Sequence, residues 1–218
     1  MIKLLEKLLN LIYIQPCYFC KSPKEDKLLC SRCYSKIRFL PKGVVRKISY
    51  CDIYVVTIYD GIIKTLVKDL KYYKKKKLAS IQAQIMHEYW QQLDFNEKFV
   101  VLPVPIHEHR LKERKYNHMD LVAKEFCKLS GNILNNQFLL RTKDTQKQFK
   151  LNKRERIQNI RNAFDVNIEN APSQDDNILI IDDITSTGIT LEEIIKVLRK
   201  NGYKNIKALT LATPDIWN

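Results

Sequence analysis

Glycine is scarce in this sequence, with five residues among 218. None of the five begins a G-x-x-x-x-G-K-[ST] loop, so a nucleotide hydrolase of the P-loop class is not expected. The sequence also lacks a run of the roughly 18 apolar residues that a bilayer-spanning helix needs. These two absences argue against a P-loop nucleotide hydrolase and against a membrane-spanning helix, and they do not argue against a binding protein or an enzyme of another class.

The N-terminal stretch 1–14 is apolar at helical spacing but carries Lys3, Glu6 and Lys7. It has no long apolar segment followed by a small-residue cleavage site, so we do not expect a signal peptide. We expect an amphipathic helix that covers the core or a partner chain. Peripheral contact with a membrane is the alternative.

Acidic residues are also under-represented, with 24 against 38 lysines and arginines and a formal net charge of +14. Such a surplus favours polyanionic partners, namely nucleic acid, phosphorylated small molecules or anionic lipid. The alternative is an A/T-rich genome that uses lysine as its ordinary surface residue. Hydrophobic residues make up 45% of the chain, which is enough for a core in one domain with a small appendage.

Four of the six cysteines form two close pairs, Cys17-x-x-Cys20 and Cys30-x-x-Cys33, with nine residues between the pairs. Each C-x-x-C turn can supply two ligands, and four thiolates complete a tetrahedral zinc site with no open position. We therefore predict a structural zinc ion. A redox pair or disulfides are the alternatives. Cys51 and Cys127 are isolated and read as small apolar residues.

After the cysteine pairs, strand-like and helix-like patterns alternate, which predicts a parallel α/β sheet. We expect a zinc module in residues 1–50 and the α/β domain in residues 51–218. Residues 141–162 are polar and lack apolar periodicity. The expected strands are 51–59, 99–104, 177–181 and 206–212, and the expected helices are 61–70, 78–90, 119–129 and 190–200.

The sharpest motif is ILIIDDITSTGIT at 178–190. Four apolar residues form a buried strand, and Asp182 and Asp183 follow at the edge where open α/β sheets bind ligands. Three hydroxyl residues and Gly188 come next, and the following helix offers its N-terminal N–H groups to a phosphate. Thr190 and Glu193 have capping-box spacing. Carboxylates suit ribose hydroxyls and Mg²⁺, so the motif predicts a sugar phosphate bound with magnesium.

Two other interpretations of this motif remain. A strand that ends in Asp-Asp is also the metal-holding half of an ATPase, but that site requires the phosphate loop that this chain lacks. The motif could also be an ordinary βα turn whose polar residues cap a helix.

The motif resembles the phosphoribosyl pyrophosphate (PRPP) motif of type I phosphoribosyltransferases. Three other segments narrow the resemblance to the ComF competence family: YDGIIKTLVKDLKYYKKKKLA (59–79), VLPVPIHEHRLKERKYNHMDLVAKEF (101–126) and TQKQFKLNKRERIQNIRNAF (145–164). The similarity covers most of the chain from Cys17 onward. Lys74 and Lys115 stand where the family pattern has glycine.

The resemblance implies a type I phosphoribosyltransferase-like fold and a role for each matched residue. Asp182 and Asp183 would hold the ribose hydroxyls and Mg²⁺. Arg110 and Arg114 would neutralise the pyrophosphate, because a guanidinium binds two phosphate oxygens at once, although both could belong to a solvated basic helix. The 5-phosphate would be bound by Thr185, Ser186, Thr187, Gly188 and Thr190.

The basic stretch from 141 to 156 corresponds in the enzyme class to a mobile hood that closes over the ligand and excludes water. Arg154 and Arg156 are its candidate catalytic side chains. The same stretch could instead follow a nucleic-acid backbone.

The ComF resemblance implies a cytoplasmic protein of natural competence, at or near the inner membrane, that binds PRPP and single-stranded DNA and meets other DNA-uptake proteins. Lysines can follow phosphates while tyrosines stack on bases, although a lysine run is usually only a solvated face. The candidate DNA-binding residues are Lys71, Tyr72, Lys74, Lys75, Lys76 and Lys77. The alternative is an active transferase that moves phosphoribose from PRPP to a nitrogen acceptor.

Overall fold

The computed structural model describes residues 16–23, 25, 27–145 and 153–214. The predicted helix at 1–14 and the central part of the predicted hood lie outside these residues. Two compact units divide the chain, residues 1–38 and residues 39–218. No helix of the described residues is both long and apolar enough to span a bilayer.

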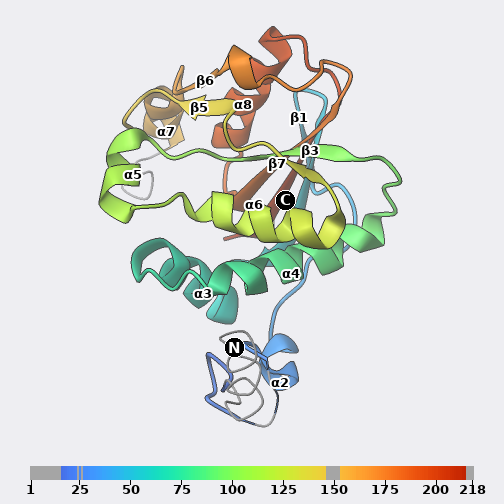
Figure 1. The fold of residues 1–218 in the computed structure, drawn as a ribbon, viewed down its shortest axis with the longest axis vertical. Helices are drawn as coiled ribbons and strands as arrows, with labels where there is room; N and C mark the ends of the chain where they lie inside the picture. The colour runs from blue at the N-terminus through green and yellow to red at the C-terminus, as the bar shows by residue number, and fades with distance from the viewer. Residues whose placement is uncertain (1–15, 24, 26, 146–152, 215–218) are drawn as a thin grey trace, which may run out of the picture. The chain divides into compact units, whose positions relative to one another are not determined.

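The larger unit is built on a six-stranded sheet in the order β1-β2-β8-β7-β3-β4 (Figure 1). Every pair of neighbours is parallel except β1 and β2, which form an antiparallel hairpin. This arrangement confirms the predicted parallel α/β sheet. The strands are β1 (Arg46–Ile48), β2 (Cys51–Ile58), β3 (Phe99–Pro103), β4 (Ile133–Leu134), β7 (Asn177–Ile184) and β8 (Ile206–Thr213).

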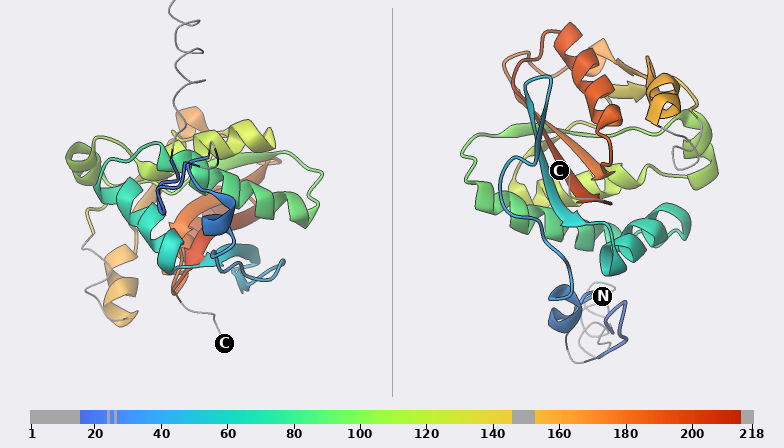
Figure 2. Two further views of the ribbon diagram at one scale, coloured as in Figure 1. Left: turned by 90° about the horizontal axis from the view of Figure 1, so that it is seen from below. Right: turned by 180° about the vertical axis from the view of Figure 1, so that it is seen from behind.

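Helices cover both faces of the sheet (Figures 1 and 2). On one face, α4 (Leu78–Trp90) and α6 (His118–Ser130) pack around Trp90, whose ring meets Phe99 edge-on at 5.3 Å between centroids. On the other face, α8 (Ile189–Lys200) joins one hydrophobic core with the alternate residues of β2, β3 and β7. α3 (Gly61–Tyr72) follows β2 and packs against α4. These four helices confirm the four predicted from apolar spacing.

Several short elements were not predicted. They are α5 (Glu108–Arg114), the edge strands β1 and β4, and a two-stranded sheet of β5 (Leu139–Arg141) and β6 (Phe164–Val166). α7 (Lys153–Ile160) lies in the stretch that showed no apolar periodicity. Among its described side chains Ile160 at its end is fully buried and the others are exposed or partly exposed, so one buried apolar residue leaves no period of 3.6 to read in the sequence.

The segment that leads into β1 already forms backbone hydrogen bonds with β2. The Leu40 amide donates to the Val56 carbonyl at 2.9 Å, and the Val45 amide donates to the Ile53 carbonyl at 2.9 Å. Residues 39–48 therefore belong to the compact unit of the sheet. The domain boundary near residue 50 stays a prediction, because a compact unit is not by itself an independently folding domain.

Candidate functional site

The carboxyl edge of the sheet carries a cavity of about 590 Å³. Its walls come from the ends of β3, β7 and β8, the last turn of α3, and α5. Five basic side chains face three carboxylates around it. The lining residues are Lys71, Tyr72, Lys74, Val104, Pro105, Ile106, Arg110, Glu113, Arg114, His118, Arg141, Asp182, Asp183, Ile184, Ser186, Thr190 and Pro214.

Asp182 and Asp183 reach this cavity from the last residues of strand β7, which ends at Ile184. They lie inside the strand rather than after it. Successive strand residues point to opposite faces, so the two carboxylates meet different partners although both line the cavity. Both are buried, with 8% and 4% of their surface exposed.

Asp183 is bound by two helices. Lys71 at the end of α3 forms an ion pair with its Oδ2, and Nε2 of His118 lies 2.9 Å from the same oxygen. A carboxylate only accepts hydrogen bonds, so Nε2 carries the hydrogen. Burial would raise the pKa of Asp183, but Lys71 and His118 hold it well below its usual range. Asp183 is therefore a charged carboxylate inside the protein.

Asp182 behaves in the opposite way. Its Oδ1 accepts the Asp183 amide at 2.9 Å. Burial, with the neighbouring Asp183 charge, raises the pKa of Asp182 to about 8, although Lys71 and Arg141 act against the shift. One carboxyl of the pair is thus held charged and the other neutral, which is the expected response of two acids that share a buried site.

The hydroxyl-rich turn after β7 contributes unequally to the cavity. Ser186 and Thr190 line it, whereas Thr185 is buried at 4% exposure and donates its amide to the Ala212 carbonyl. Thr187 and Gly188 are not among the lining residues. The structure brings two of the five predicted phosphate-binding residues to the cavity wall.

Glycine is favoured at position 188 by its backbone conformation and by close packing. Its φ is +77°, and a Cβ would lie 2.6 Å from Cδ1 of Ile48. Next to it, Nη1 of Arg46 donates to the Thr187 carbonyl at 2.8 Å. The β1–β2 hairpin therefore packs against the turn and fixes its backbone, so the preference for glycine arises from this packing and from the positive φ.

The predicted capping box was wrong. α8 begins at Ile189 with Gly188 as its N-cap and without a side-chain cap. Thr190 consequently lies inside the first turn, and a carboxylate oxygen of Glu193 instead accepts the Asn162 amide at 3.1 Å. The Thr-x-x-Glu spacing was coincidental, because the backbone had already turned into the helix one residue earlier.

Arg110 and Arg114 both line the cavity from α5. Nη2 of Arg110 donates to the Thr145 carbonyl at 2.6 Å, while Arg141 donates to the Thr145 hydroxyl. One buried threonine thus holds two guanidinium groups side by side. Burial, with the Arg110 charge nearby, lowers the pKa of Arg141 to about 10. A pair of like charges held at a cavity wall is arranged to receive an anion.

The loop after β3 is fixed by the start of α6. Asn117 caps this helix, since its Oδ1 accepts the Met119 amide at 3.1 Å, and its Nδ2 donates to the Val104 carbonyl at 3.2 Å. Lys115 just before it adopts a left-handed conformation with φ of +69°, and so does Lys74 with φ of +55°. Both lysines expected at glycine positions therefore take a backbone conformation that glycine adopts most easily.

Three residues of the cavity escaped the sequence interpretation of the sugar-phosphate site. Lys71 was assigned to DNA, Arg141 only to the hood, and His118 to nothing. The sole available signal was their proximity to motifs, because pairing across 65 residues, as between His118 and Asp183, leaves no pattern in one sequence.

The candidate DNA-binding residues separate into two groups. Lys71 has 19% of its side chain exposed and is paired with Asp183 inside the cavity. Tyr72, at 55% exposure, and Lys74 lie at the cavity's border. Lys75, Lys76 and Lys77 are exposed beyond it.

The candidate catalytic arginines lie on α7. Arg154 is exposed and is not among the residues that line the cavity. The side chain of Arg156, together with hood residues 146–152, lies outside the described residues. Their catalytic assignment stays a prediction.

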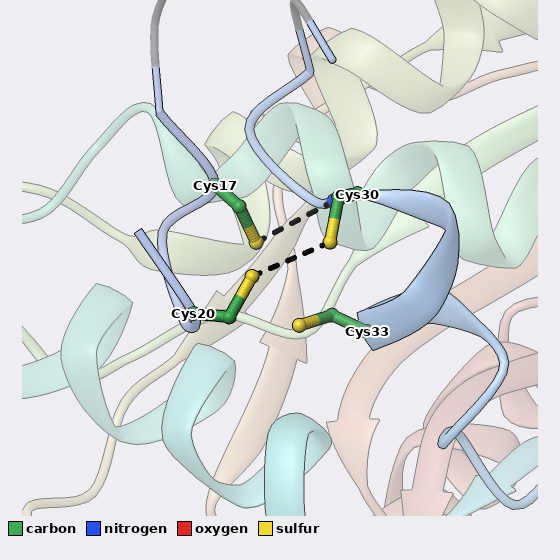
Figure 3. A group of neighbouring side chains, drawn as sticks. All are labelled: Cys17, Cys20, Cys30 and Cys33. Atoms are coloured by element: carbon green, nitrogen blue, oxygen red, sulfur yellow. Dashed lines mark hydrogen bonds between the residues drawn. The ribbon is translucent and has the colours of Figure 1, made fainter. Parts of the chain in front are cut away.

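Among the described residues of the unit 1–38, one group of potential metal ligands is present: Cys17, Cys20, Cys30 and Cys33 (Figure 3). Their Sγ atoms all lie within 4.8 Å of one another, and none of the four forms a disulfide. Four thiolates about 2.3 Å from one zinc ion would be separated by about 3.8 Å. The cluster can therefore hold a metal such as zinc.

Local hydrogen bonds favour the thiolate form of one cysteine of this cluster, Cys20. The Cys30 amide points at Sγ of Cys17 at 3.5 Å. Hydrogen bonds from the Ser22 backbone and the Arg32 side chain lower the pKa of Cys20 to about 6. Donors of this kind favour the thiolate form, which is the form that binds metal.

Comparisons with known proteins agree with the geometry. A family model described as "Phosphoribosyl transferase domain" matches residues 137–215. The chain is 24% identical to "Competence protein F" of Haemophilus influenzae, over 90% of this chain and 89% of that protein. It is 26% identical to "DNA utilization protein YhgH" of Escherichia coli, over 89% and 88%.

A structural comparison gives a TM-score of 0.43 and 15% identity with a solved structure described as the allosteric regulatory enzyme of purine biosynthesis. That match covers 66% of this chain and 29% of the other.

Proposed function

We propose that this chain, a homologue of competence protein F and of DNA utilization protein YhgH with a phosphoribosyl transferase domain, binds PRPP with magnesium and single-stranded DNA during DNA uptake. The observation that carries the proposal is the cavity at the carboxyl edge, where paired acids meet basic and hydroxyl side chains.

The composition of the cavity matches a ligand with a phosphate, a diol and a pyrophosphate. Ser186 and Thr190 offer hydroxyls to the 5-phosphate, while Asp182 suits the ribose diol. Arg110 and Arg141, held together by Thr145, supply bidentate donors for pyrophosphate. Carboxylate oxygens are the ligands that Mg²⁺ prefers, and bound Mg²⁺ would neutralise pyrophosphate charge.

The border of the cavity supports the DNA part of the proposal. Tyr72 and Tyr73 are more than half exposed, and the guanidinium of Arg114 lies 5.1 Å from the Tyr72 ring centroid. Lys76 lies over the ring of Tyr116 at 4.9 Å; this ring is buried, so it holds the lysine in place and is not itself a stacking surface. Exposed aromatic rings interleaved with cations can stack on unpaired bases and follow a phosphate backbone.

Turnover is the second candidate function, and the match to a phosphoribosyl transferase domain favours it. The chain's own contribution would be to orient PRPP, exclude water and stabilise departing pyrophosphate with Arg110 and Arg141. Release of pyrophosphate that depends on one added nitrogen base would establish this activity. A binding site alone does not establish it.

Calorimetric titration with PRPP and Mg²⁺ tests the binding proposal. Asp182→Asn should abolish the heat of binding, because an amide, unlike a carboxyl group, cannot lose a proton to become the charged oxygen ligand that Mg²⁺ prefers. The matched control is Asp175→Asn, an exposed aspartate outside the cavity, which should bind as the parent chain does. Equal heats for Asp182→Asn and the parent chain would refute the site.

Fluorescence anisotropy with labelled oligonucleotides tests the DNA proposal. Single strands should bind more tightly than duplex, and affinity should fall steeply with salt because bound lysines release counterions. Binding that is indifferent to salt would contradict a lysine-lined path.

A further inference from the structure

The ammonium group of a lysine contacts one of the two buried acids of the cavity. Lys71 reaches Asp183 from the last turn of α3, and their side chains are 19% and 5% exposed. His118 from α6 donates to the same oxygen, Oδ2, at 2.9 Å. Asp183 is thus held on that oxygen by two donors of the chain itself.

This arrangement changes what a free metal ion meets at the pair. Two adjacent buried carboxylates attract a divalent cation most strongly when both are charged and unneutralised. Here the Lys71 charge already lies against Asp183, so a metal ion that approaches alone meets one negative charge fewer at the pair than it would without the lysine. It also finds a fixed positive charge within contact distance of the acids.

We propose that Lys71 is a built-in counter-cation that excludes free divalent metal ions from the Asp182–Asp183 pair, so that magnesium enters only together with the sugar phosphate. The inference rests on the proposed PRPP function. Lys71 offsets negative charge at the acids, and the phosphates of the ligand replace that charge around the metal ion. The site can therefore bind the metal–ligand complex but not the bare ion.

A purely structural role for Lys71 gives a different expectation. If Lys71 only anchored α3 to β7, its removal would lower stability and leave metal affinity unchanged or weaker. A counter-cation role instead predicts a gain of metal affinity. A gain of this kind cannot arise from partial unfolding, so the two roles are separable by one measurement.

The experiment titrates Mn²⁺ into the zinc-loaded full chain without any sugar phosphate and follows free Mn²⁺ by electron paramagnetic resonance. Lys71→Met and Lys71→Gln should each bind Mn²⁺ at least about ten-fold more tightly than the parent chain. Gln removes the charge and keeps a hydrogen-bond donor on a side chain one atom shorter, which provides a second variant if Met lowers stability. Two controls should match the parent: Lys71→Arg, which keeps the charge, and Lys74→Met, which removes a cavity lysine that forms no ion pair with the acids among the described residues.

Adding Asp182→Asn to Lys71→Gln should erase the gained affinity. Unchanged or weaker Mn²⁺ binding in both Lys71→Met and Lys71→Gln would overturn the proposal, as would an equal gain in Lys74→Met. The readout contains no PRPP, so its failure is distinct from failure of the proposed function. A gain in Mn²⁺ affinity in a chain that never binds PRPP would refute the proposed ligand and leave the counter-cation role standing.

Discussion

The two units of this chain obtain their structure by different means. The unit of residues 39–218 surrounds a parallel sheet whose central strands are buried on both faces. In the unit of residues 1–38, the described residues contain one four-residue helix, Ser31–Tyr34, and a group of four cysteines. Hydrophobic burial can sustain the first unit, whereas for the described residues of the second we expect metal ligation by the four cysteines to supply much of the stability.

The difference shows how each unit should respond to a perturbation. A change at the cysteines acts on one unit through loss of a ligand, and a change at the acids acts on the other through buried charge. The experiments below test this contrast, beginning with the largest expected effect.

Zinc removal should affect the stability of the unit of residues 1–38 and leave that of the larger unit unchanged. Binding of structural zinc is worth about 10–16 kcal/mol in finger peptides, so a chelator or Cys20→Ser should make residues 16–38 sensitive to protease. Residues 39–145 and 153–214 should stay as resistant as they are in the parent chain. Cys127→Ala, which removes a buried thiol from α6, should keep its zinc by elemental analysis. If the larger unit also became sensitive, the contrast between the units would be wrong.

Removing one acid of the cavity should destabilise the larger unit alone. Asp183→Asn leaves the mostly buried Lys71 without its carboxylate, and breaking such a pair costs about 3 kcal/mol or more. Urea unfolding at neutral pH measures the loss. Asp175→Asn, at an exposed position, should unfold as the parent chain does, and an equally stable Asp183→Asn would contradict the buried ion pair.

Replacing Asp182 should raise stability, in contrast to replacing Asp183. The pKa of Asp182 is raised to about 8, so between about pH 4 and pH 8 the folded chain binds more protons there than the unfolded chain, and stability falls as pH rises. Asp182→Asn removes this slope. At pH 8 it should be more stable than the parent by on the order of 1–3 kcal/mol, with the gap closing toward pH 4. A gap that widens toward pH 4 would reverse the assignment.

The proposed DNA contact lies on the larger unit, and Tyr73 tests it. Tyr73→Ala should weaken single-strand binding by about 1–3 kcal/mol if a base stacks on the ring, as measured by anisotropy. Tyr50→Ala is the matched control, because Tyr50 is 96% exposed but stands at the β1–β2 turn. An equal loss in both variants, or none in Tyr73→Ala, would move the contact away from the cavity border.

The smallest expected effect concerns Lys115. Its φ of +69° costs a non-glycine residue roughly 1 kcal/mol, partly offset by the entropy that glycine loses on folding. Lys115→Gly should therefore raise stability by up to about 1 kcal/mol in urea titrations. A clear loss of stability would mean that the lysine side chain makes a compensating contact.

The fold was accessible from the sequence where periodicity was strong. Helix Leu78–Trp90 was predicted at its observed bounds, and the strands at 51–58, 99–103 and 206–213 within a residue or two. Elements of two to four residues, such as β1 and β4, are too short to show a period. They form because a neighbouring strand offers hydrogen-bond partners far away in the sequence.

The site was accessible only in part for the same reason. The motif at 178–190 located the acids and the turn, but nothing local distinguished Asp182 from Asp183. Their difference comes from Lys71 and His118, which arrive from two separate helices. A sequence shows which groups a site contains, whereas the charge state of each group is set by neighbours that only folding brings together.

The hydrogen bond from Arg46 to the Thr187 carbonyl links the β1–β2 hairpin to the turn after β7. Arg46 stands eight residues after Arg38, where the cysteine unit ends, in the first strand that the chain enters. Leu40 and Val45, which precede Arg46, already pair with β2, so a shift of the β1–β2 hairpin would pass through this hydrogen bond to the turn whose Ser186 lines the cavity. The hairpin is absent from the cavity wall and is nevertheless coupled to its geometry.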